Sequence, residues 1–414
     1  MRNSIIDFTA GGIFAAIFGT TSSIIRQAMS RVKGGFCSYA PRFNNYWRDR
    51  YYELSREFTG YDSVVAFCEG SVAVEAFWRV ARAYTGKPGI WGGLVDPDDV
   101  GKDKPVSDAM HGWTLGSMIA AGKMNWPELH YYPELGESRF GSDYGRTGCM
   151  IMEPYHAPSG QFHKIDPTIN RISARVREFE NILFCVDEIQ GGFGRTGKLF
   201  AFDHYGKSLP RPTFVTIGKL AGGGMPLSAL LGPKEIMESD TIKEFGHLSS
   251  THSGHPVMCS VGVAVIEEIQ KQGLILQAEQ KGEILHKLLS ELPIQTHGKG
   301  LMAGLVLQDN IEVKEIVKRC EELGLIVCDT GRKWVKIAPA LTIKENEIIK
   351  GCKTLQQVVE EVVGARKDEP EAHGNIGEGS GPGSEVLQTP GVQPSGESGN
   401  TKGPENEGSE GKPD

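Results

Sequence analysis

Two acids, an amide and a lysine near the middle of the chain have the types and the spacing for amine chemistry. Asp187, Glu188 and Gln190 follow one short apolar run, and Lys219 ends a second. A lone acid at a strand end is usually a helix cap, and a lone lysine is usually a solvated charge. Together they are the parts that a pyridoxal phosphate site needs: an amine for a Schiff base and a carboxylate facing the ring nitrogen.

The elements that must position these residues are two buried strands. The continuous apolar runs at 183–186 and 213–218 are typical of strands covered on both faces of a parallel sheet. Because ligands in open α/β sheets sit outside the carboxyl ends of the strands, the residues after each run should lie at one site. The glycines at 191–197 and 222–224 predict sharp turns and close backbone approach after each strand.

A third strand end offers an anion site. The apolar run at 64–68 ends before Gly70 and Ser71, and helical spacing follows over 74–84. The free N–H groups and the dipole of a helix N-terminus both favour a phosphate. The ordinary explanation is a tight connection between a strand and a helix, which the residues alone favour.

Composition limits the class of protein. The 414 residues, 39% of them hydrophobic, are enough for a large core and two domains. A formal net charge of -8 argues against nucleic acid or an anionic membrane surface as the main partner. The eight cysteines have no metal-like spacing and indicate reduced thiols in a cytoplasmic protein. Residues 5–25 are interrupted by Asp7 and are too short in their uncharged part to span a membrane.

The stretch VDEIQGGFGRTG, with IGKLAGGGMPLSALL behind it, resembles the signature of the class III aminotransferases, which include the ornithine and acetylornithine enzymes. The resemblance implies an α/β protein of the fold type I of pyridoxal-phosphate-dependent transferases. Its large domain would have a mostly parallel sheet, and its smaller C-terminal domain would be α+β. The expected division is a truncated N-terminal segment at 1–28, a large cofactor-binding domain at 29–258, a small domain at 259–364 and a disordered polar tail at 365–414.

The same resemblance assigns the roles of the site residues. Lys219 would hold the pyridoxal 5'-phosphate cofactor as a Schiff base, Asp187 would face the ring nitrogen, and Gln190 would bind the phenolic oxygen. Thr251 would reach the phosphate of a neighbouring subunit's cofactor, so that a homodimer shares its active sites. The other expected contacts are Gly70 and Ser71 at the phosphate, Met110 and His111 at the cofactor ring, and Trp113 and Lys336 at the substrate.

Several residues depart from the family pattern. Glu69 stands where Ser or Thr is usual, Met110 where an aromatic residue is usual, and Lys336 where an arginine pairs with the substrate carboxylate. A lysine lacks the planar fork of arginine, so recognition of a carboxylate should be looser. The chain also begins late compared with the family, and residues 86–105 and 125–144 are expected to be loops.

Three functions follow from these observations. The first is an aminotransferase that moves an amino group from a primary amine or amino acid to a carbonyl acceptor. The second is an aminomutase or a decarboxylating transferase of the same fold. The third is a catalytically weakened, cofactor-binding homologue. No metal site is expected, because the histidines at 247–255 come without an acid or a cysteine.

Overall fold

The structure is a computed structural model, and it describes most of the chain up to residue 367. The described residues are 5–33, 45–87, 89–92, 129–131, 147–157, 160–178, 182–244, 248–307, 311–330 and 334–367. The tail expected at 365–414 lies outside them from residue 368 onward.

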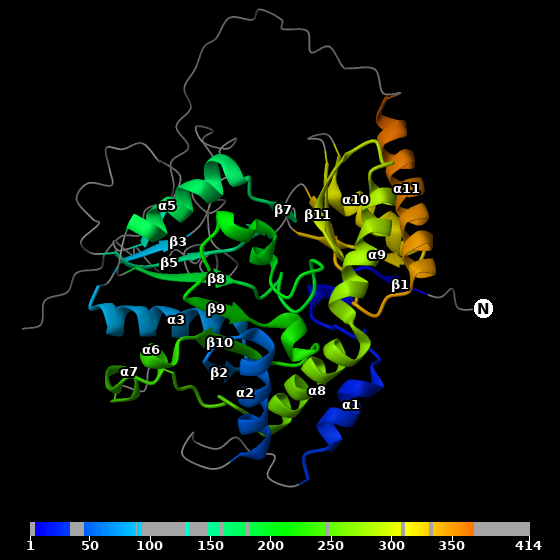
Figure 1. Ribbon diagram of the computed structural model, residues 1–414. Coiled ribbons are helices and arrows are strands. Elements are labelled where there is room, and N and C mark those ends of the chain that lie inside the picture. The colour runs from blue at the N-terminus through cyan, green and yellow to red at the C-terminus, as the bar shows by residue number, and fades with distance from the viewer. Residues whose placement is uncertain are drawn as a thin grey trace, which may run out of the picture. The chain divides into compact units, whose positions relative to one another are not determined.

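A seven-stranded sheet forms the centre of the fold (Figure 1). Its strands, in spatial order, are β2 (Ser63–Phe67), β10 (Ser228–Gly232), β9 (Phe214–Ile217), β8 (Leu183–Asp187), β5 (Thr147–Met152), β3 (Gly89–Gly92) and β4 (Leu129–Tyr131). The pairs from β9 to β4 are parallel, whereas β10 runs antiparallel to both of its neighbours. This confirms the α/β class with a mostly parallel sheet.

Helices cover both faces of this sheet, which explains why the first four residues of β8 are all apolar. Leu183 and Cys185 belong to a cluster with α3 (Gly70–Thr85), while Phe184 and Val186 belong to the main core on the other face. Among the helices that contribute residues to this main core are α2 (Tyr46–Thr59), α5 (Asn170–Glu178) and α8 (Pro256–Gln272). A strand that is buried on both faces has apolar side chains at successive positions and does not alternate between apolar and polar residues.

The later part of the chain forms a second, antiparallel sheet. Its strands are β11 (Gln295–Lys299), β12 (Met302–Val306), β15 (Trp334–Ile337) and β14 (Cys328–Asp329), in that order. Around it lie α9 (Leu274–Leu289), α10 (Val313–Glu322) and α11 (Glu345–Lys367), as Figure 1 shows. Within the described ranges no helix is long and apolar enough to cross a membrane.

The first described residues pack against this second part of the chain. Strand β1 (Ile6–Asp7) pairs in parallel with β13 (Leu325–Ile326), and the carbonyl of Phe8 accepts a hydrogen bond of 2.7 Å from Ala338 N–H. The Phe8 ring is fully buried, and it lies against α11 where a Cβ added at Gly351 would come within 2.3 Å of the ring. Gly351 therefore makes room for the N-terminal segment.

We expect Gly351→Ala to destabilise the protein by about 1–3 kcal/mol. Alanine is the better helix former by roughly 1 kcal/mol, but the added methyl group would overlap a buried ring, and such overpacking costs more than it gains. Urea unfolding measures the difference, and Lys350→Ala, at an exposed neighbouring position of the same helix, serves as the control. Equal stability of the two variants would mean that Phe8 does not pack there.

Some elements differ from the sequence-based expectations. Strand β3 lies in the expected loop at 86–105, and β4 lies in the expected loop at 125–144. Both strands are short, and their Gly-rich or polar surroundings hide them from pattern analysis. Helix α11 continues to Lys367, three residues into the expected tail.

Candidate active site

Asp187 and the segment leading to Lys219 lie side by side at the carboxyl ends of two parallel strands. Asp187, the last residue of β8, pairs with Thr216 of β9, and Glu188 N–H donates to the Thr216 carbonyl at 2.8 Å. Lys219 follows Thr216 by three residues. Burial lowers the pKa of Lys219, and the charges of Asp187 and Glu153 oppose that shift. The acid and the amine expected to act together are thus close enough to interact.

The side chain of Ile189 ties three parts of the site together. A Cβ added at Gly70 would lie 2.6 Å from Ile189 Cδ1, and one added at Gly218 would lie 3.4 Å from Ile189 Cγ2. Gly70 begins α3, Gly218 precedes Lys219, and Ile189 follows Asp187 by two residues. The absence of a side chain at Gly70 therefore brings the N-terminus of α3 against the segment after Asp187.

The backbone of Lys219 has a left-handed conformation, with φ of 45°. Such a conformation costs a non-glycine residue roughly 1 kcal/mol or more and recurs at functional sites. It arises where β9 ends and a single 3-10 turn, Lys219–Gly222, begins. A strained, partly buried lysine at a strand end is consistent with a role beyond folding.

The expected phosphate contacts, Gly70 and Ser71, form the first turn of α3. Glu69 precedes the helix as an exposed residue, and its carbonyl accepts a 2.7 Å bond from Ser228 Oγ. In the part of the chain that the structure describes, the Glu69 side chain caps none of the first N–H groups of the helix. The Glu69 side chain thus leaves the helix N-terminus open to another ligand.

Gln190 and Lys336 are brought together from opposite parts of the sequence. Lys336 Nζ donates to Gln190 Oε1 at 2.7 Å and also to the carbonyl of Ala157. The Lys336 side chain is buried, and that burial lowers its pKa to about 7. Lys219 and Glu153 also act on this pKa, in opposite directions, which places Lys336 in the same site.

Three expected residues, Met110, His111 and Trp113, lie outside the described residues. Thr251 is exposed in the turn before α8. This turn is held by its own chain: Asn45 Nδ2 donates to the carbonyl of Gly254 at 3.0 Å, and His255 Nδ1 accepts from Val257 N–H at 3.3 Å. His255 therefore caps α8.

Sequence reasoning missed the buried groups around Lys336. Arg195 is fully buried, and its Nη1 donates to the carbonyls of Leu301 and Pro339, so it joins the loop after β8 to the second sheet. Phe14 and Tyr155 lie with their rings against the ammonium of Lys336. The position of Arg195 within the glycine-rich run GFGRTG could have indicated its role. No sequence pattern indicated the role of Phe14 or Tyr155.

Glu188 supports the loop that carries Gln190. Its buried carboxylate accepts bonds of 2.9 Å from the N–H groups of Ala201 and Phe202, at the start of the turn Ala201–Ser208. Burial raises the pKa of Glu188 to about 8, although the two N–H donors favour the ionised form. Its contacts indicate a structural rather than a catalytic acid.

We expect the free energy of unfolding of the wild type to decrease as the pH rises from about 5 to 8, whereas that of Glu188→Gln should not show this decrease. In this window the native carboxyl keeps a proton that the unfolded chain has released, so raising the pH drives unfolding. The relative change should be roughly 2–4 kcal/mol, measured by urea unfolding at several pH values. Glu283→Gln, at an exposed position of α9, is the control and should run parallel to the wild type. If the stability of Glu188→Gln changed with pH in the same way as that of the wild type, this result would contradict the raised pKa of Glu188.

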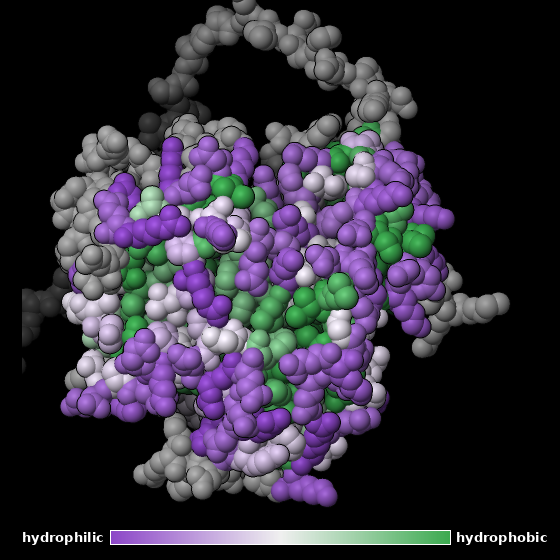
Figure 2. All heavy atoms as spheres, in the orientation of Figure 1, coloured by the Kyte–Doolittle hydropathy of each residue, from purple (hydrophilic) through white to green (hydrophobic). Residues whose placement is uncertain are grey.

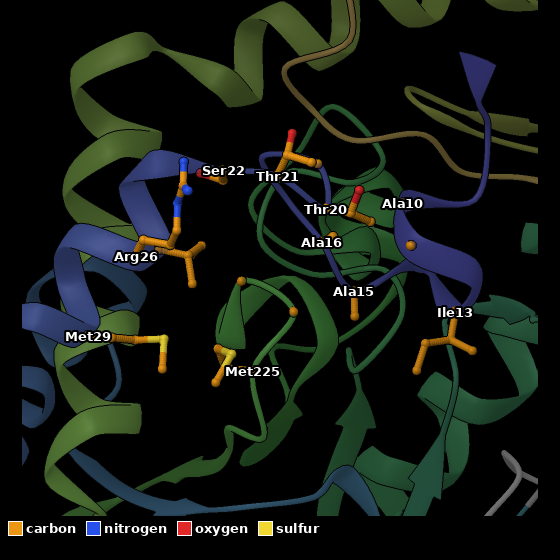
Figure 3. A pocket seen from close by; sticks show the side chains of 15 residues that line it. Ala10, Ile13, Ala15, Ala16, Thr20, Thr21, Ser22, Arg26, Met29 and Met225 are labelled. Carbon is orange, nitrogen blue, oxygen red and sulfur yellow. The ribbon is translucent and has the colours of Figure 1, made fainter. Parts of the chain in front are cut away.

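A pocket of about 640 Å³ adjoins the loop after Lys219 (Figure 3). Gly223, Gly224 and Met225 line one side, and residues between Ala10 and Met29 line the other. Ile13 is 65% exposed beside it. In Figure 2 hydrophobic residues gather on the face of the molecule over the segment that joins β1 to α1 (Ser23–Ser30).

Comparison with known proteins identifies the class. The model of the family described as aminotransferase class-III matches residues 143–359. This match spans more than half of the chain and includes β8, β9 and Lys219, so the chain belongs to the class III aminotransferases.

Individual relatives and structures agree with this family. The chain is 27% identical over 385 residues to an acetylornithine aminotransferase of Caldanaerobacter subterraneus, covering 87% of this chain and 91% of the relative. It is 36% identical over 230 residues to a leucine/methionine racemase of Thermococcus litoralis, covering 52% and 50%. The ornithine aminotransferase structure from Toxoplasma gondii matches with a TM-score of 0.70 at 22% identity, over 88% of this chain and 87% of that one.

The enzyme is therefore a pyridoxal-phosphate-dependent aminotransferase of fold type I, acting on an amine donor and a carbonyl acceptor. The described residues fit this cofactor. Gly70, which has no Cβ, lets the N-terminus of α3 lie close to the segment after Asp187. Asp187 supplies a carboxylate that is 8% exposed, and Lys219 supplies a partly buried amine near it.

Proposed function

We propose that Lys219 and Asp187 are the catalytic pair of this aminotransferase. The single observation that carries the proposal is their shared position at the ends of β8 and β9, where the amine is partly buried and interacts with the carboxylate. Lys219 would hold the cofactor and, with its pKa lowered by burial, take and return the substrate's proton. Asp187 would keep the ring nitrogen protonated, so that the bound pyridoxal phosphate serves as an electron sink.

The other contacts are proposed from the same arrangement. Gly70 and Ser71, in the first turn of α3, would hold the phosphate, because a helix N-terminus favours an anion. Gln190 would donate to the phenolic oxygen. The donor is a primary amine or amino acid, and the acceptor is a carbonyl compound. The test is to incubate the protein with pyridoxal phosphate, an amine donor and a keto acid and to follow both products. Failure to form the aminated acceptor with any donor of a broad panel would contradict the proposal.

We propose further that the enzyme is a homodimer in which Thr251 serves the partner's site. Thr251 is exposed in a turn that its own chain holds in place. The apolar surface around Ile13 and the adjoining pocket also support coverage by a second subunit.

Thr251→Ala is expected to weaken cofactor binding about 10-fold, the effect of losing one hydrogen bond to a charged group. In a purified mixed dimer of Thr251→Ala and Lys219→Ala chains, the intact lysine faces the partner's intact threonine. One site per dimer should then bind cofactor with wild-type affinity. If Thr251 acted within its own chain, that site would instead show the weakened affinity of Thr251→Ala. Ser249→Ala in the same turn is the control.

A second reaction deserves its own test because of the racemase relative, which shares 36% identity over 230 residues. Racemisation removes and returns the same Cα proton without a carbonyl acceptor, whereas amino transfer requires the acceptor. Loss of optical activity of an amino acid in the absence of any keto acid would favour racemisation. The aminomutase or decarboxylating alternative would be recognised by its products in the same assay.

Two further proposals concern organisation. We propose a large domain at 29–258 and a small one at 259–364. The two separate sheets support this division, and α8, which packs with the core beside the large sheet, runs across its boundary. We also propose a cytoplasmic location, supported by the cysteines of the described chain, all of which are free thiols.

A further inference from the structure

Lys336 is a buried lysine whose hydrogen bonds go to its own chain. Its side chain is 2% exposed, and Nζ donates to the carbonyl of Ala157 and to Gln190 Oε1, the latter at 2.7 Å. The ammonium also lies 4.9 Å from the ring centroid of Phe14 and 5.9 Å from that of Tyr155. Burying an ammonium costs so much that it normally persists only where it is paired.

These contacts fix the orientation of the Gln190 side chain. A carboxamide has one face that accepts hydrogen bonds, Oε1, and one that donates, Nε2. The hydrogen bonds of Lys336 to Ala157 and Gln190 use two of its N–H groups, and an amine keeps two N–H groups even after it has lost its proton. In either state the oxygen of Gln190 must therefore face Lys336, and Nε2 must point elsewhere.

The same contacts occupy most of the hydrogen-bonding capacity of Lys336 that a substrate could use. Two N–H groups are used within the chain, and two aromatic rings lie against the ammonium. A substrate carboxylate would have to displace these partners, and a lysine offers it no bidentate fork in return.

We propose that Lys336 is a positioning residue: it orients Gln190 so that Nε2 donates to the phenolic oxygen of the cofactor, and it does not bind the substrate carboxylate. The inference rests on the proposed site, in which Gln190 faces that oxygen. Donation to the oxygen stabilises its negative charge. A bound cofactor without this donor holds a proton more tightly, and the pH at which its visible absorbance changes moves upward.

The test is a double-mutant cycle read by absorbance. Wild type, Lys336→Met, Gln190→Leu and the double variant are loaded with pyridoxal phosphate, and the visible band is titrated with pH. Each single variant should raise the midpoint by about one unit, as expected for the loss of a hydrogen bond to a charged group. Because Lys336 acts through Gln190, adding Lys336→Met to Gln190→Leu should move the midpoint by less than about 0.3 unit further.

Additive shifts in the cycle would overturn the proposal, because they would mean that the charge of Lys336 acts on the cofactor directly. An unchanged midpoint in Lys336→Met, together with a KM raised only for donors that carry a carboxylate, would also overturn it and would restore the substrate role. Lys336→Gln, which keeps a donor for the Ala157 carbonyl, replaces Lys336→Met in the cycle if the latter does not fold. Absence of any band in the wild type would contradict the proposed site itself, and so is distinguishable from failure of this inference.

Discussion

Lys219→Ala is expected to lower the rate of amino transfer by about 10³-fold or more and to remove the visible absorbance band that forms when pyridoxal phosphate is added. The variant loses both the covalent anchor of the cofactor and the group that moves the substrate's proton. Lys219 is partly buried and interacts with the charge of Asp187, and Lys336 is a second lysine whose charge acts in this site.

The rate is measured as a single turnover with an amine donor, and cofactor binding is measured separately by equilibrium dialysis. Lys234→Ala, at an exposed position of the short helix α6 (Lys234–Met237), is the control and should keep both the band and the rate. The band would persist in Lys219→Ala only if another amine held the cofactor, and that result would remove Lys219 from the mechanism. The substitution does not relieve the backbone strain at this position, because alanine tolerates a φ of 45° no better than lysine does.

Asp187→Asn should reduce the turnover by about 10²-fold or more while leaving the fold intact. Asp187 Oδ1 accepts a 2.9 Å hydrogen bond from Ile189 N–H, and an asparagine oxygen can keep that bond. What is lost is the negative charge that would hold the ring nitrogen protonated. The cofactor should then still bind, with a band of altered position, but should stabilise the developing negative charge poorly.

The comparison uses the cofactor-loaded variant, so that weaker binding is not mistaken for slower chemistry. Asp240→Asn, at an exposed position in α7 (Asp240–Glu244), controls for the loss of one acid. Turnover within a factor of about three of the wild type would show that Asp187 is a structural acid, because such a factor is less than 1 kcal/mol.

The sequence was sufficient for the centre of the site because that part depends on local patterns. The apolar runs before Asp187 and Lys219 are strands with nearly the predicted bounds, and the rule that ligands sit at the carboxyl ends of parallel strands placed their neighbours together. The helix that begins at Gly70 was also predictable from a strand, a glycine and helical spacing.

Other features depend on contacts between distant residues and leave no local pattern. Gln190 and Lys336 are 146 positions apart, and their hydrogen bond exists only because β15 carries Lys336 to the loop after β8. Strand β10 was not expected, since SALLG directly follows a glycine-rich turn and runs against the direction of its neighbours. The burial of Arg195 similarly follows from two carbonyls, of Leu301 and Pro339, more than a hundred residues away.

The pairing of β1 with β13 has a consequence for the synthesis of the chain. The first described residues bond to partners that the ribosome adds only after more than three hundred further residues: Ile6 meets Leu325, and the carbonyl of Ile17 accepts from Leu341 N–H. Closing so long a loop is slow, so this segment must wait unpaired through most of translation. Its apolar residues are then exposed to chaperones and proteases. The time that the segment takes to dock limits how quickly a newly synthesised chain completes its folding.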